Sequence, residues 1–491
     1  MAGQADQQGS DIGMPLYVDL DGTLVRTDVA QELLVGAMRA PGALPGILCA
    51  GWTHGASGIK RATWSEERFF PELLPYDDEV LAYLRQARSE GRRLVLATAA
   101  DRRVAEAVAG FLGLFDAILA SDPGRNLKGA AKLDAIRADS GGAAFEYLGD
   151  SPADIPIWQA AARAGFVAPK GAARVMARDA GTEATLVTAP PPPLWRGLWK
   201  AMRPHQWAKN VLILLPLFFA HLYTDPGALA AVLVGFVAMS LMASAVYIFN
   251  DLLDIPADRR HRTKRHRPFA AGLVQPVHGV GAGLGCLGAA LGLGFGGVGL
   301  AFGVILVIYF IMTTAYSFVL KRFSTIDVIV LSLLYIVRIV AGAAACGITL
   351  SPWLLTFALF FFVSLAYMKR FIELESVEED AKLPSRNYWG AEMASIQIFG
   401  IASAAVALLT LAQYMNTPIA RETYGARDIL WLAVPVMMFW IYRTWLWAIR
   451  GKVGDDPVVF ALTDRVSQLT LLTLLAIFLS ARYFEFAGFI H

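Results

Sequence analysis

The chain has 491 residues, of which 56% are hydrophobic, and its mean hydropathy of +0.48 exceeds what an ordinary soluble domain carries. A formal net charge of +2 argues against a general nucleic-acid binder, so we expect no nucleic-acid partner. The three cysteines lie in different segments and show neither a disulfide framework nor a zinc-binding spacing. Residues 1–13 lack the basic and apolar regions of a cleavable signal and predict a disordered N-terminus. The composition therefore favours a membrane protein.

Residues 14–187 mix charged and apolar positions and predict a soluble domain. Three short apolar runs end near Leu20, Asp101 and Gly149, and each is followed by helical spacing. This alternation favours a Rossmann-like α/β domain with a parallel sheet and helices on both faces. The helical spacing of residues 29–80 interrupts the alternation and predicts a helical cap inserted after the first strand.

A proline-rich connector over residues 188–195 leads to an all-α membrane domain expected over residues 196–491. Its apolar runs are each near the roughly 20 residues that a bilayer demands. We expect nine transmembrane helices, centred on residues 216, 239, 287, 309, 335, 360, 402, 438 and 475.

Lysine and arginine gather in every second connection between these spans, starting with the segment before the first one. The positive-inside rule then places the soluble domain and the basic loops in the cytoplasm. An odd number of spans puts the C-terminus outside. We therefore expect a multi-pass protein of the inner (cytoplasmic) membrane.

Two carboxylates follow the first expected strand in the stretch DLDGTL, where Asp19 and Asp21 lie two residues apart. Both project from the edge of the sheet at which ligands bind in open α/β folds. One carboxylate at such a place can attack phosphorus, and the other can protonate the leaving oxygen. A hydroxyl, a cation and two carboxylates suited to magnesium occur further along the chain: Thr98, Lys128, Asp150 and Asp154.

This set resembles the haloacid-dehalogenase-like superfamily over residues 14–187. The resemblance implies hydrolysis of a phosphomonoester, with Asp19 as nucleophile and Asp21 as general acid/base. It also implies that Thr98 and Lys128 bind phosphate, with Lys132 as the less favoured candidate for the lysine. The Mg²⁺ ligands that it implies are Asp19, Asp21, Asp150 and Asp154.

One stretch of the membrane half, NDLLDIPADRRHRTKRHRPFAAG, is strongly charged. Helical spacing puts Asn250, Asp254 and Asp258 on one face, with Asp251 on the same flank, although Pro256 interrupts an ideal helix. Carboxylates this close raise one another's pKa unless a cation holds them, so a divalent ion is expected. The arginines and lysines that follow suit the oxygens of a magnesium–polyphosphate. A solvated basic loop with charge-balancing aspartates is the alternative.

This charged stretch resembles the UbiA superfamily of intramembrane prenyltransferases, and the resemblance covers residues 195–491. Typical members carry a second acidic motif, DxxxD, after the sixth span. Here that place reads YMKRFIELESVEED, with Lys369, Arg370 and Glu373 but no aspartate pair. Glu375 and Glu379 have the separation of such a pair. The segments RPHQWAKNVLILLPLFF and KRFIEL are similar instead to the decaprenyl-phosphate phosphoribosyltransferase branch.

That branch implies phosphoribosyl pyrophosphate as donor and a membrane lipid, polyprenyl phosphate, as acceptor. It implies catalytic roles for Asp251 and Asp254, with Mg²⁺ held by Asn250, Asp251, Asp254 and Asp258. Arg338 joins the substrate-binding set because a charge inside an apolar span is costly and functional by default. The expected substrate-binding residues are Lys209, Asn210, Arg262, Lys264, Arg265, Arg267, Arg338, Lys369, Arg370 and Glu373.

The two halves predict a bifunctional enzyme, because the transferred group carries a 5-phosphate that the soluble domain can remove. Two other functions stay open: a prenyltransferase acting on an aromatic or other small acceptor, and a transporter with a regulatory soluble domain. The sequence also leaves open whether the protein forms a homo-oligomer.

Overall fold

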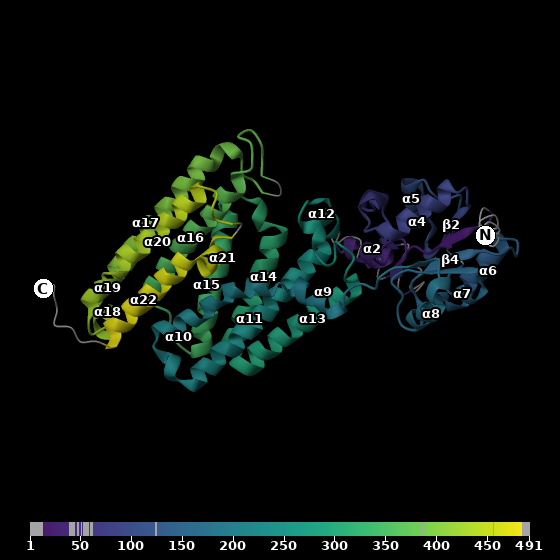
Figure 1. Ribbon diagram of the computed structural model, residues 1–491. Helices are drawn as coiled ribbons and strands as arrows, with labels where there is room; N and C mark the ends of the chain where they lie inside the picture. The colour runs from purple at the N-terminus through teal and green to yellow at the C-terminus, as the bar shows by residue number, and fades with distance from the viewer. Residues whose placement is uncertain are drawn as a thin grey trace. The chain divides into compact units, whose positions relative to one another are not determined.

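The computed structural model describes residues 13–38, 62–122, 125–383, 386–454 and 456–483, and between 39 and 61 only positions 45, 46, 49, 50, 52 and 58. The chain divides into two compact units. The first comprises Met1–Met202 with Tyr247–Gly283, and the second comprises Arg203–Val246 with Leu284–His491. All six described strands belong to the first unit (Figure 1).

The six strands form one parallel sheet in the order β3-β2-β1-β4-β5-β6. Tyr17 in the central strand pairs with Val95 on one side and with Tyr147 on the other. Because every pairing is parallel, all six strands end at the same edge of the sheet. The predicted α/β domain with a parallel sheet is confirmed. The strands are β1 (Leu16–Val18), β2 (Leu94–Asp101), β3 (Ala117–Ser121), β4 (Glu146–Gly149), β5 (Arg163–Phe166) and β6 (Leu186–Val187).

Helices cover both faces of this sheet (Figure 1). Leu16 and Val18 pack in a core with α4 and α5, whereas Tyr17 packs in a second core with α6, α7 and α8. Successive strand residues point to opposite faces, so burial on both faces requires a continuous apolar run such as LYV. The helices are α4 (Asp78–Ser89), α5 (Arg102–Leu112), α6 (Ala130–Asp139), α7 (Ile155–Ala160) and α8 (Ala172–Ala180), with the short turns η4 (Pro152–Asp154) and η5 (Gly181–Glu183).

The described part of the expected cap begins with helix α2 (Val29–Ala37). Asp28 caps this helix, because its carboxylate accepts a hydrogen bond from the backbone N of Gln31. Two short helical turns, η2 (Glu66–Arg68) and η3 (Pro71–Leu73), lie near the other end of the segment. The middle of the predicted 29–80 cap lies outside the described residues.

The first unit also contains α9 (Leu194–Met202) and a charged loop, residues 250–272, between α11 (Pro226–Leu253) and α13 (Pro276–Leu291). Within the loop, α12 (Ile255–Arg260) is followed by the turn η8 (Lys264–His266). Pro256 lies in the first turn of α12, where its missing N–H is tolerated. Helical hydrogen bonds still join Asp254 N to Asn250 O at 2.9 Å and Asp258 N to Asp254 O at 2.8 Å.

Eight helices among the described residues are long and apolar enough to cross a membrane. They contain the predicted centres from residue 239 to residue 475. These spans are built on α11, on α13 with its π-helical continuation η9 (Gly292–Val298), and on α14 (Leu300–Phe318), α15 (Ile326–Cys346), α16 (Pro352–Leu374), α17 (Met393–Met415), α20 (Ala433–Ile449) and α22 (Arg465–Tyr483). Shorter connecting helices are η10 (Leu320–Arg322), η11 (Gly390–Glu392), α18 (Pro418–Thr423), α19 (Arg427–Leu430) and α21 (Pro457–Thr463).

The first predicted span, centred on residue 216, is not among these eight, so the expected nine spans are not confirmed. The segment instead forms η6 (Pro204–Leu214), α10 (Leu215–Phe219) and η7 (Leu222–Thr224). Pro204 and Pro216 each lie in the first turn of a new element, which divides the apolar run into short pieces. The expectation of an external C-terminus depended on an odd number of spans. The eight spans among the described residues do not support it.

Candidate active sites

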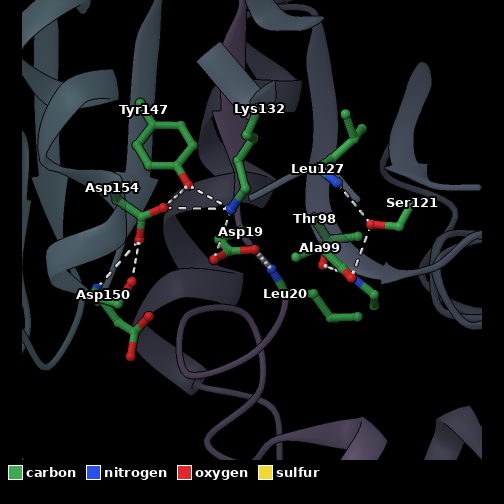
Figure 2. A network of polar contacts seen from close by, with 12 residues as sticks. Asp19, Leu20, Thr98, Ala99, Ser121, Leu127, Lys132, Tyr147, Asp150 and Asp154 are labelled. Carbon is green, nitrogen blue, oxygen red and sulfur yellow. Dashed lines mark hydrogen bonds and ion pairs between the residues drawn. The ribbon is translucent and has the colours of Figure 1, made fainter. Parts of the chain in front are cut away.

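The first candidate site lies at the carboxyl edge of the sheet, where neighbouring strands end. Asp19 directly follows β1, Asp150 directly follows β4, and Thr98 lies in β2. Because β1 lies between β2 and β4, parallel pairing brings these positions together. Figure 2 shows Asp19 at the centre of the resulting polar network.

Gly22 makes the close approach at this edge possible. Its φ of +77° is in the left-handed region, which favours glycine. A Cβ atom at this position would lie 2.3 Å from Asp150 Oδ2. The glycine of DLDGTL therefore lets the turn after β1 pass directly beside the carboxylate that follows β4.

Lys132 is the cation at this centre (Figure 2). Its Nζ lies 3.0 Å from Asp19 Oδ2 and 3.4 Å from Asp154 Oδ1, and the side chain is buried. Burial lowers the pKa of this ammonium group, but the charges of Asp19 and Asp154 outweigh the effect and raise it above its ordinary value. Lys132 therefore stays charged between two carboxylates.

Tyr147 fixes both partners of this contact. Its hydroxyl accepts a hydrogen bond from Lys132 Nζ at 3.0 Å and donates one to Asp154 Oδ1 at 2.8 Å. Ser151 Oγ lies 3.1 Å from the other carboxylate oxygen, Asp154 Oδ2, and donates to it. The side chain of Tyr147 is fully buried. Hydrogen bonds from Tyr147 and Ser151 therefore hold both carboxylate oxygens of Asp154 in place.

Three carboxylates at this edge fit a divalent metal ion. Asp19, Asp150 and Asp154 each offer an oxygen, these oxygens lie within 4.8 Å of one another, and all three residues are buried. Burial raises the pKa of Asp19 to about 6, with Asp154 and Asp150 adding to the rise and Lys132 opposing it. Burial also raises the pKa of Asp150, although Lys170 Nζ lies 2.6 Å from its Oδ2 and opposes the rise. Oxygen-only donors of this kind suit Mg²⁺.

The remaining residues predicted for this site are Asp21, Thr98 and Lys128. Asp21 is not part of the three-carboxylate group, and its Oδ1 accepts a hydrogen bond from the backbone N of Val29 at 2.9 Å. Thr98 is fully buried, and its Oγ1 accepts from Ala100 N at 3.0 Å. Lys128 is exposed. The structure thus favours Lys132, the less favoured candidate in the sequence, because Lys132 lies on the first turn of α6 and its Nζ is beside Asp19.

The second candidate site is the charged loop. Arg267 Nη1 lies 3.1 Å from Asp251 Oδ1 and 2.7 Å from Asp258 Oδ2, and both carboxylates are buried. Burial raises the pKa of Asp258, and the charge of Arg267 opposes the rise. Two of the four residues of the predicted acidic face, Asp251 and Asp258, therefore meet at one guanidinium group. Asn250 and Asp254 are half-buried beside it.

Most of the predicted cations of the loop point to solvent. Arg262, Lys264 and Arg265 are exposed. Arg259 is different, because its side chain is only 8% exposed and forms an ion pair with Glu32. The basic run of the sequence thus contains cations bound by the protein, such as Arg259 and Arg267, and exposed cations that are open to a ligand.

The second compact unit contains the remaining predicted residues, in three clusters. In the first, Arg338 donates from Nε to Asn210 Oδ1 at 2.8 Å and from Nη2 to the hydroxyl of Tyr309 at 3.0 Å. Asn210 in turn donates to Ser240 Oγ at 3.0 Å. Arg338 also donates to the carbonyl oxygen of Leu334. The buried charge of α15 is thus held by neutral oxygens.

In the same unit Lys209 and Lys369 share one carboxylate, that of Asp456. Lys209 hydrogen-bonds it directly, and Lys369 Nζ lies 3.6 Å from its Oδ2. Burial raises the pKa of Asp456, but the two lysines outweigh this and hold it below its ordinary value. Two cations and one anion leave this cluster with a net positive charge.

The third cluster surrounds Arg370, whose side chain is fully buried. Arg370 pairs with Glu373 and lies 3.4 Å from Asp327, and Arg386 contacts both acids at 3.3 Å. Tyr388 donates to Asp327 Oδ1 at 2.6 Å. In the described part of the chain, Arg370 Nη2 has no hydrogen-bond partner. Asp327 is thus the shared partner of Arg370 and Arg386.

Sequence reasoning missed Tyr147, Asp327, Arg386 and Asp456. Lys209 and Asp456 are 247 residues apart, and no local spacing predicts such a pair. Asp327 offered a signal, since an acid in the first turn of an apolar span needs a partner. Glu375 and Glu379, which have the spacing of the missing acidic pair, are exposed.

Comparison with known proteins places both halves in families. Residues 213–482 match the UbiA prenyltransferase family, and residues 16–159 match the haloacid dehalogenase-like hydrolases. The chain is 36% identical to an uncharacterised protein of Sinorhizobium fredii over 464 residues, which are 93% of this chain and 89% of that protein. It is 33% identical to decaprenyl-phosphate phosphoribosyltransferase of Mycobacterium tuberculosis over 296 residues, which are 59% of this chain and 96% of that protein.

A solved structure of a UbiA homolog from Archaeoglobus fulgidus bound to GPP and Mg²⁺ is 15% identical, covering 57% of this chain and 99% of that chain with a TM-score of 0.45. The family match alone spans more than half of this chain. The chain therefore belongs to the UbiA prenyltransferase family and carries a haloacid dehalogenase-like hydrolase domain at its N-terminal side. Eight of its described helices are long and apolar enough to cross a membrane, and with the family match they make it an integral membrane enzyme.

Proposed function

We propose that this enzyme transfers 5-phosphoribose from phosphoribosyl pyrophosphate to a polyprenyl phosphate and then removes the 5-phosphate. The observation that carries the proposal is the union, in one chain, of two parts. One is a membrane half that aligns with nearly the whole of a decaprenyl-phosphate phosphoribosyltransferase. The other is an Asp19 centre with the parts of a phosphatase. The first reaction makes a phosphomonoester, and the second consumes one.

In the phosphatase step, Asp19 is the nucleophile. Its carboxylate oxygen bonds to phosphorus as the bond to the ester oxygen breaks, and Asp21 donates a proton to the departing oxygen. Water then attacks the aspartyl-phosphate, with Asp21 accepting the proton, which returns Asp19 and releases phosphate. Lys132 neutralises the phosphoryl oxygens from its place beside Asp19, and Thr98 lies on the neighbouring strand as the phosphate-binding hydroxyl.

Magnesium fits the carboxylates of this centre. Asp19, Asp150 and Asp154 would hold it, because their oxygens are buried and close together. A bound Mg²⁺ supplies positive charge that offsets the charge of the phosphoryl group. Asp21 is oriented by the N–H of Val29 and is left for proton transfer.

In the transferase step, the bond between the anomeric carbon of ribose and pyrophosphate breaks, and a polyprenyl-phosphate oxygen bonds to that carbon. The acceptor is already an ionised phosphate, so the reaction needs no general base. The catalytic carboxylates are Asp251 and Asp254, and the donor's phosphates are bound by cations from the predicted set. Lys209, Lys369 and Arg370 support this role, because Arg370 is buried and the two half-buried lysines share a single carboxylate.

The oxygens of Asn250, Asp251, Asp254 and Asp258 have the chemistry that Mg²⁺ prefers. We propose that they hold magnesium, which supplies charge to the pyrophosphate leaving group. Arg267 already contacts two of these acids, so it is placed to exchange between carboxylate and phosphate oxygens. The exposed Arg262, Lys264 and Arg265 add further cations to the donor's site.

We also propose that the hydrolase domain and the basic loops face the cytoplasm across the inner membrane, because lysine and arginine gather in alternate connections. Phosphoribosyl pyrophosphate is a charged, soluble donor, so its site must open to an aqueous phase. A lipid product made on the same side is within reach of the Asp19 centre.

The test is to incubate the purified full chain with ribose-labelled phosphoribosyl pyrophosphate, a polyprenyl phosphate and Mg²⁺, and to extract the lipid. Label should enter the lipid phase, first as the phosphorylated and then as the dephosphorylated ribosyl lipid. Absence of label from the lipid would overturn the proposal. Turnover of a polyprenyl diphosphate with an aromatic acceptor would then favour the prenyltransferase alternative, which the family name supports.

A further inference from the structure

Helix α2 of the cap joins the Asp19 centre to the charged loop, and all three belong to the first compact unit. At its N-terminus, Val29 N donates to Asp21. One turn later, Gln31 and Glu32 contact residues of the loop or of the helix that follows it. The same short helix therefore touches the proposed acid/base of the phosphatase and the loop of the membrane half.

An ion pair anchors α2 to the loop. Arg259 Nη1 lies 2.8 Å from Glu32 Oε2 and Arg259 Nη2 lies 2.6 Å from Glu32 Oε1, the two parallel hydrogen bonds of a bidentate pair. The two side chains are 8% and 12% exposed. Arg259 Nε also donates to the carbonyl oxygen of Ala270 at 2.8 Å, which fixes the guanidinium group within the loop. All three guanidinium nitrogens thus donate to protein acceptors.

Apolar and polar contacts flank this ion pair. Val35, one turn after Gln31, is buried in a core with Leu252, Ile255 and Phe269. Gln31 Oε1 accepts from the backbone N of Val277 at 3.1 Å. The contact is therefore packed as well as charged, and it holds α2 at Gln31, Glu32 and Val35.

The turn after the DLDGTL motif makes a further contact with the loop. A Cβ atom on Gly272 would lie 3.0 Å from Arg26 Cβ. On the other side of the cap, the Arg260 guanidinium lies 4.4 Å from the centre of the Phe70 ring. Both ends of the described cap segment thus meet the same loop.

We propose that Glu32 and Arg259 are a positioning pair that fixes the cap on the charged loop, so that the phosphatase prefers a phosphomonoester carried by a membrane lipid to a soluble one. This inference rests on the proposed function, because the lipid-linked phosphomonoester is its intermediate. The exposed Arg262, Lys264 and Arg265 follow Arg259 in the loop and are available to bind the phosphate of such a lipid.

The physical reason for the preference is confinement. A soluble ester reaches Asp19 by diffusion and needs only the local contact between α2 and Asp21. A lipid-linked ester stays at the membrane surface, so the Asp19 centre must be held at the loop where the lipid phosphate arrives. Loss of the ion pair should therefore slow only the lipid-linked reaction.

The experiment compares the full chain with Glu32→Gln, Arg259→Gln and the double variant in phosphatidylcholine–phosphatidylglycerol vesicles containing polyprenyl phosphate. Labelled phosphoribosyl pyrophosphate is added, and dephosphorylation of the labelled lipid is followed beside hydrolysis of p-nitrophenyl phosphate. Each single variant should lose about tenfold or more on the lipid, because misplacing a bound substrate is costly, and stay within about twofold on p-nitrophenyl phosphate. The double variant should lose no more than the worse single one, because the two residues act as one unit.

Arg93→Gln is the matched control. Arg93 forms the same bidentate geometry with Asp139, at 2.7 and 2.9 Å, within the α/β domain, and its loss should leave the ratio of the two activities unchanged. Equal losses of Glu32→Gln on both substrates, or no loss on either, would overturn the positioning role while leaving the proposed function intact. A wild-type protein that labels no lipid would overturn both.

Discussion

Lys128 and Lys132 are four residues apart, yet it is Lys132 whose Nζ lies beside Asp19. Helix α6 begins at Ala130, so Lys132 lies in its first turn and is buried, whereas Lys128 lies before the helix and is exposed. The stretch NLKGAAK offers two lysines, and only the point at which the helix begins distinguishes them. Asp19 and Asp150 were simpler to predict, because each directly follows a strand of a parallel sheet.

This difference gives a prediction for two lysine variants. Lys132→Ala should lower kcat for p-nitrophenyl phosphate hydrolysis by about 10²–10³-fold, the usual loss when a charge-stabilising group is removed from an active site. Lys128→Ala should stay within about twofold, because its side chain is exposed. Steady-state kinetics of both variants in the same detergent would check this. A larger loss for Lys128→Ala than for Lys132→Ala would contradict the assignment.

At the scale of elements, the conformation of the turn after β1 depends on the close approach of Gly22 to Asp150. Gly22 and Gly91 have nearly the same backbone angle, with φ of +77° and +78°. A Cβ atom would meet Asp150 at position 22 and nothing within 4 Å at position 91. Alanine substitutions at the two glycines therefore separate the free-energy cost of backbone strain from the effect of displacing the Asp150 carboxylate.

Gly91→Ala should cost only the strain of a left-handed residue, about 1–2 kcal/mol, and should leave phosphatase kcat unchanged. Gly22→Ala should cost the same strain and in addition displace Asp150, so kcat should fall by about tenfold or more, since small misplacements at a reacting centre are costly. Thermal unfolding and p-nitrophenyl phosphate kinetics of both variants would test this. Equal kcat values in the two variants would show that the contact with Asp150 is unimportant.

The role of the connection before α21 was also not predictable from the sequence. Asp456 caps α21 and also pairs with Lys209 and Lys369, which belong to distant segments. Sequence periodicity predicts helices and strands, but it does not predict which distant elements form ion pairs. The predicted lysines were therefore placed in the substrate site without their shared counter-ion.

Removing that counter-ion gives a stability prediction. Asp456→Asn leaves two cations without their partner in a largely buried place, which should lower the free energy of unfolding by about 3–5 kcal/mol. If these lysines bind the donor's phosphates, phosphoribosyl pyrophosphate should raise the Tm of Asp456→Asn more than that of the wild type. Asp464→Asn breaks the Arg443 pair of the same unit and serves as control, with a lowered Tm but an ordinary ligand shift. Equal ligand shifts in all three proteins would argue against phosphate binding by the lysines.

At the scale of the whole molecule, an α/β domain followed by a helical membrane domain is confirmed, and eight of the nine expected spans correspond to long apolar helices among the described residues. The span predicted around residue 216 is not confirmed, because mean hydropathy does not show where a proline begins a new helical element. The charged loop was predicted as a polyphosphate site, but nothing in the residues near Arg259 indicated its pairing with Glu32. Pairing between a cap and a loop more than 200 residues apart has no local signature.

Two variants should separate the reactions of the two halves. Asp19→Asn should label the lipid normally but accumulate the phosphorylated product, because the nucleophile is lost and the charged loop is unchanged. Asp251→Asn should label no lipid yet hydrolyse p-nitrophenyl phosphate at the wild-type rate. Thin-layer separation of the labelled lipids would read out the first variant and a colour assay the second.

Mixing the two variants tests how the product passes between the sites. A lipid product diffuses within one bilayer but does not leave it, so Asp19→Asn and Asp251→Asn placed in the same vesicles should together produce the dephosphorylated lipid. The same proteins in separate vesicles should accumulate only the phosphorylated lipid. Because tethering raises the effective concentration of linked sites, the mixed vesicles should still be slower than wild type at equal protein. Dephosphorylated lipid at equal rates in separate and shared vesicles would mean that the intermediate is soluble and that the acceptor is not a membrane lipid.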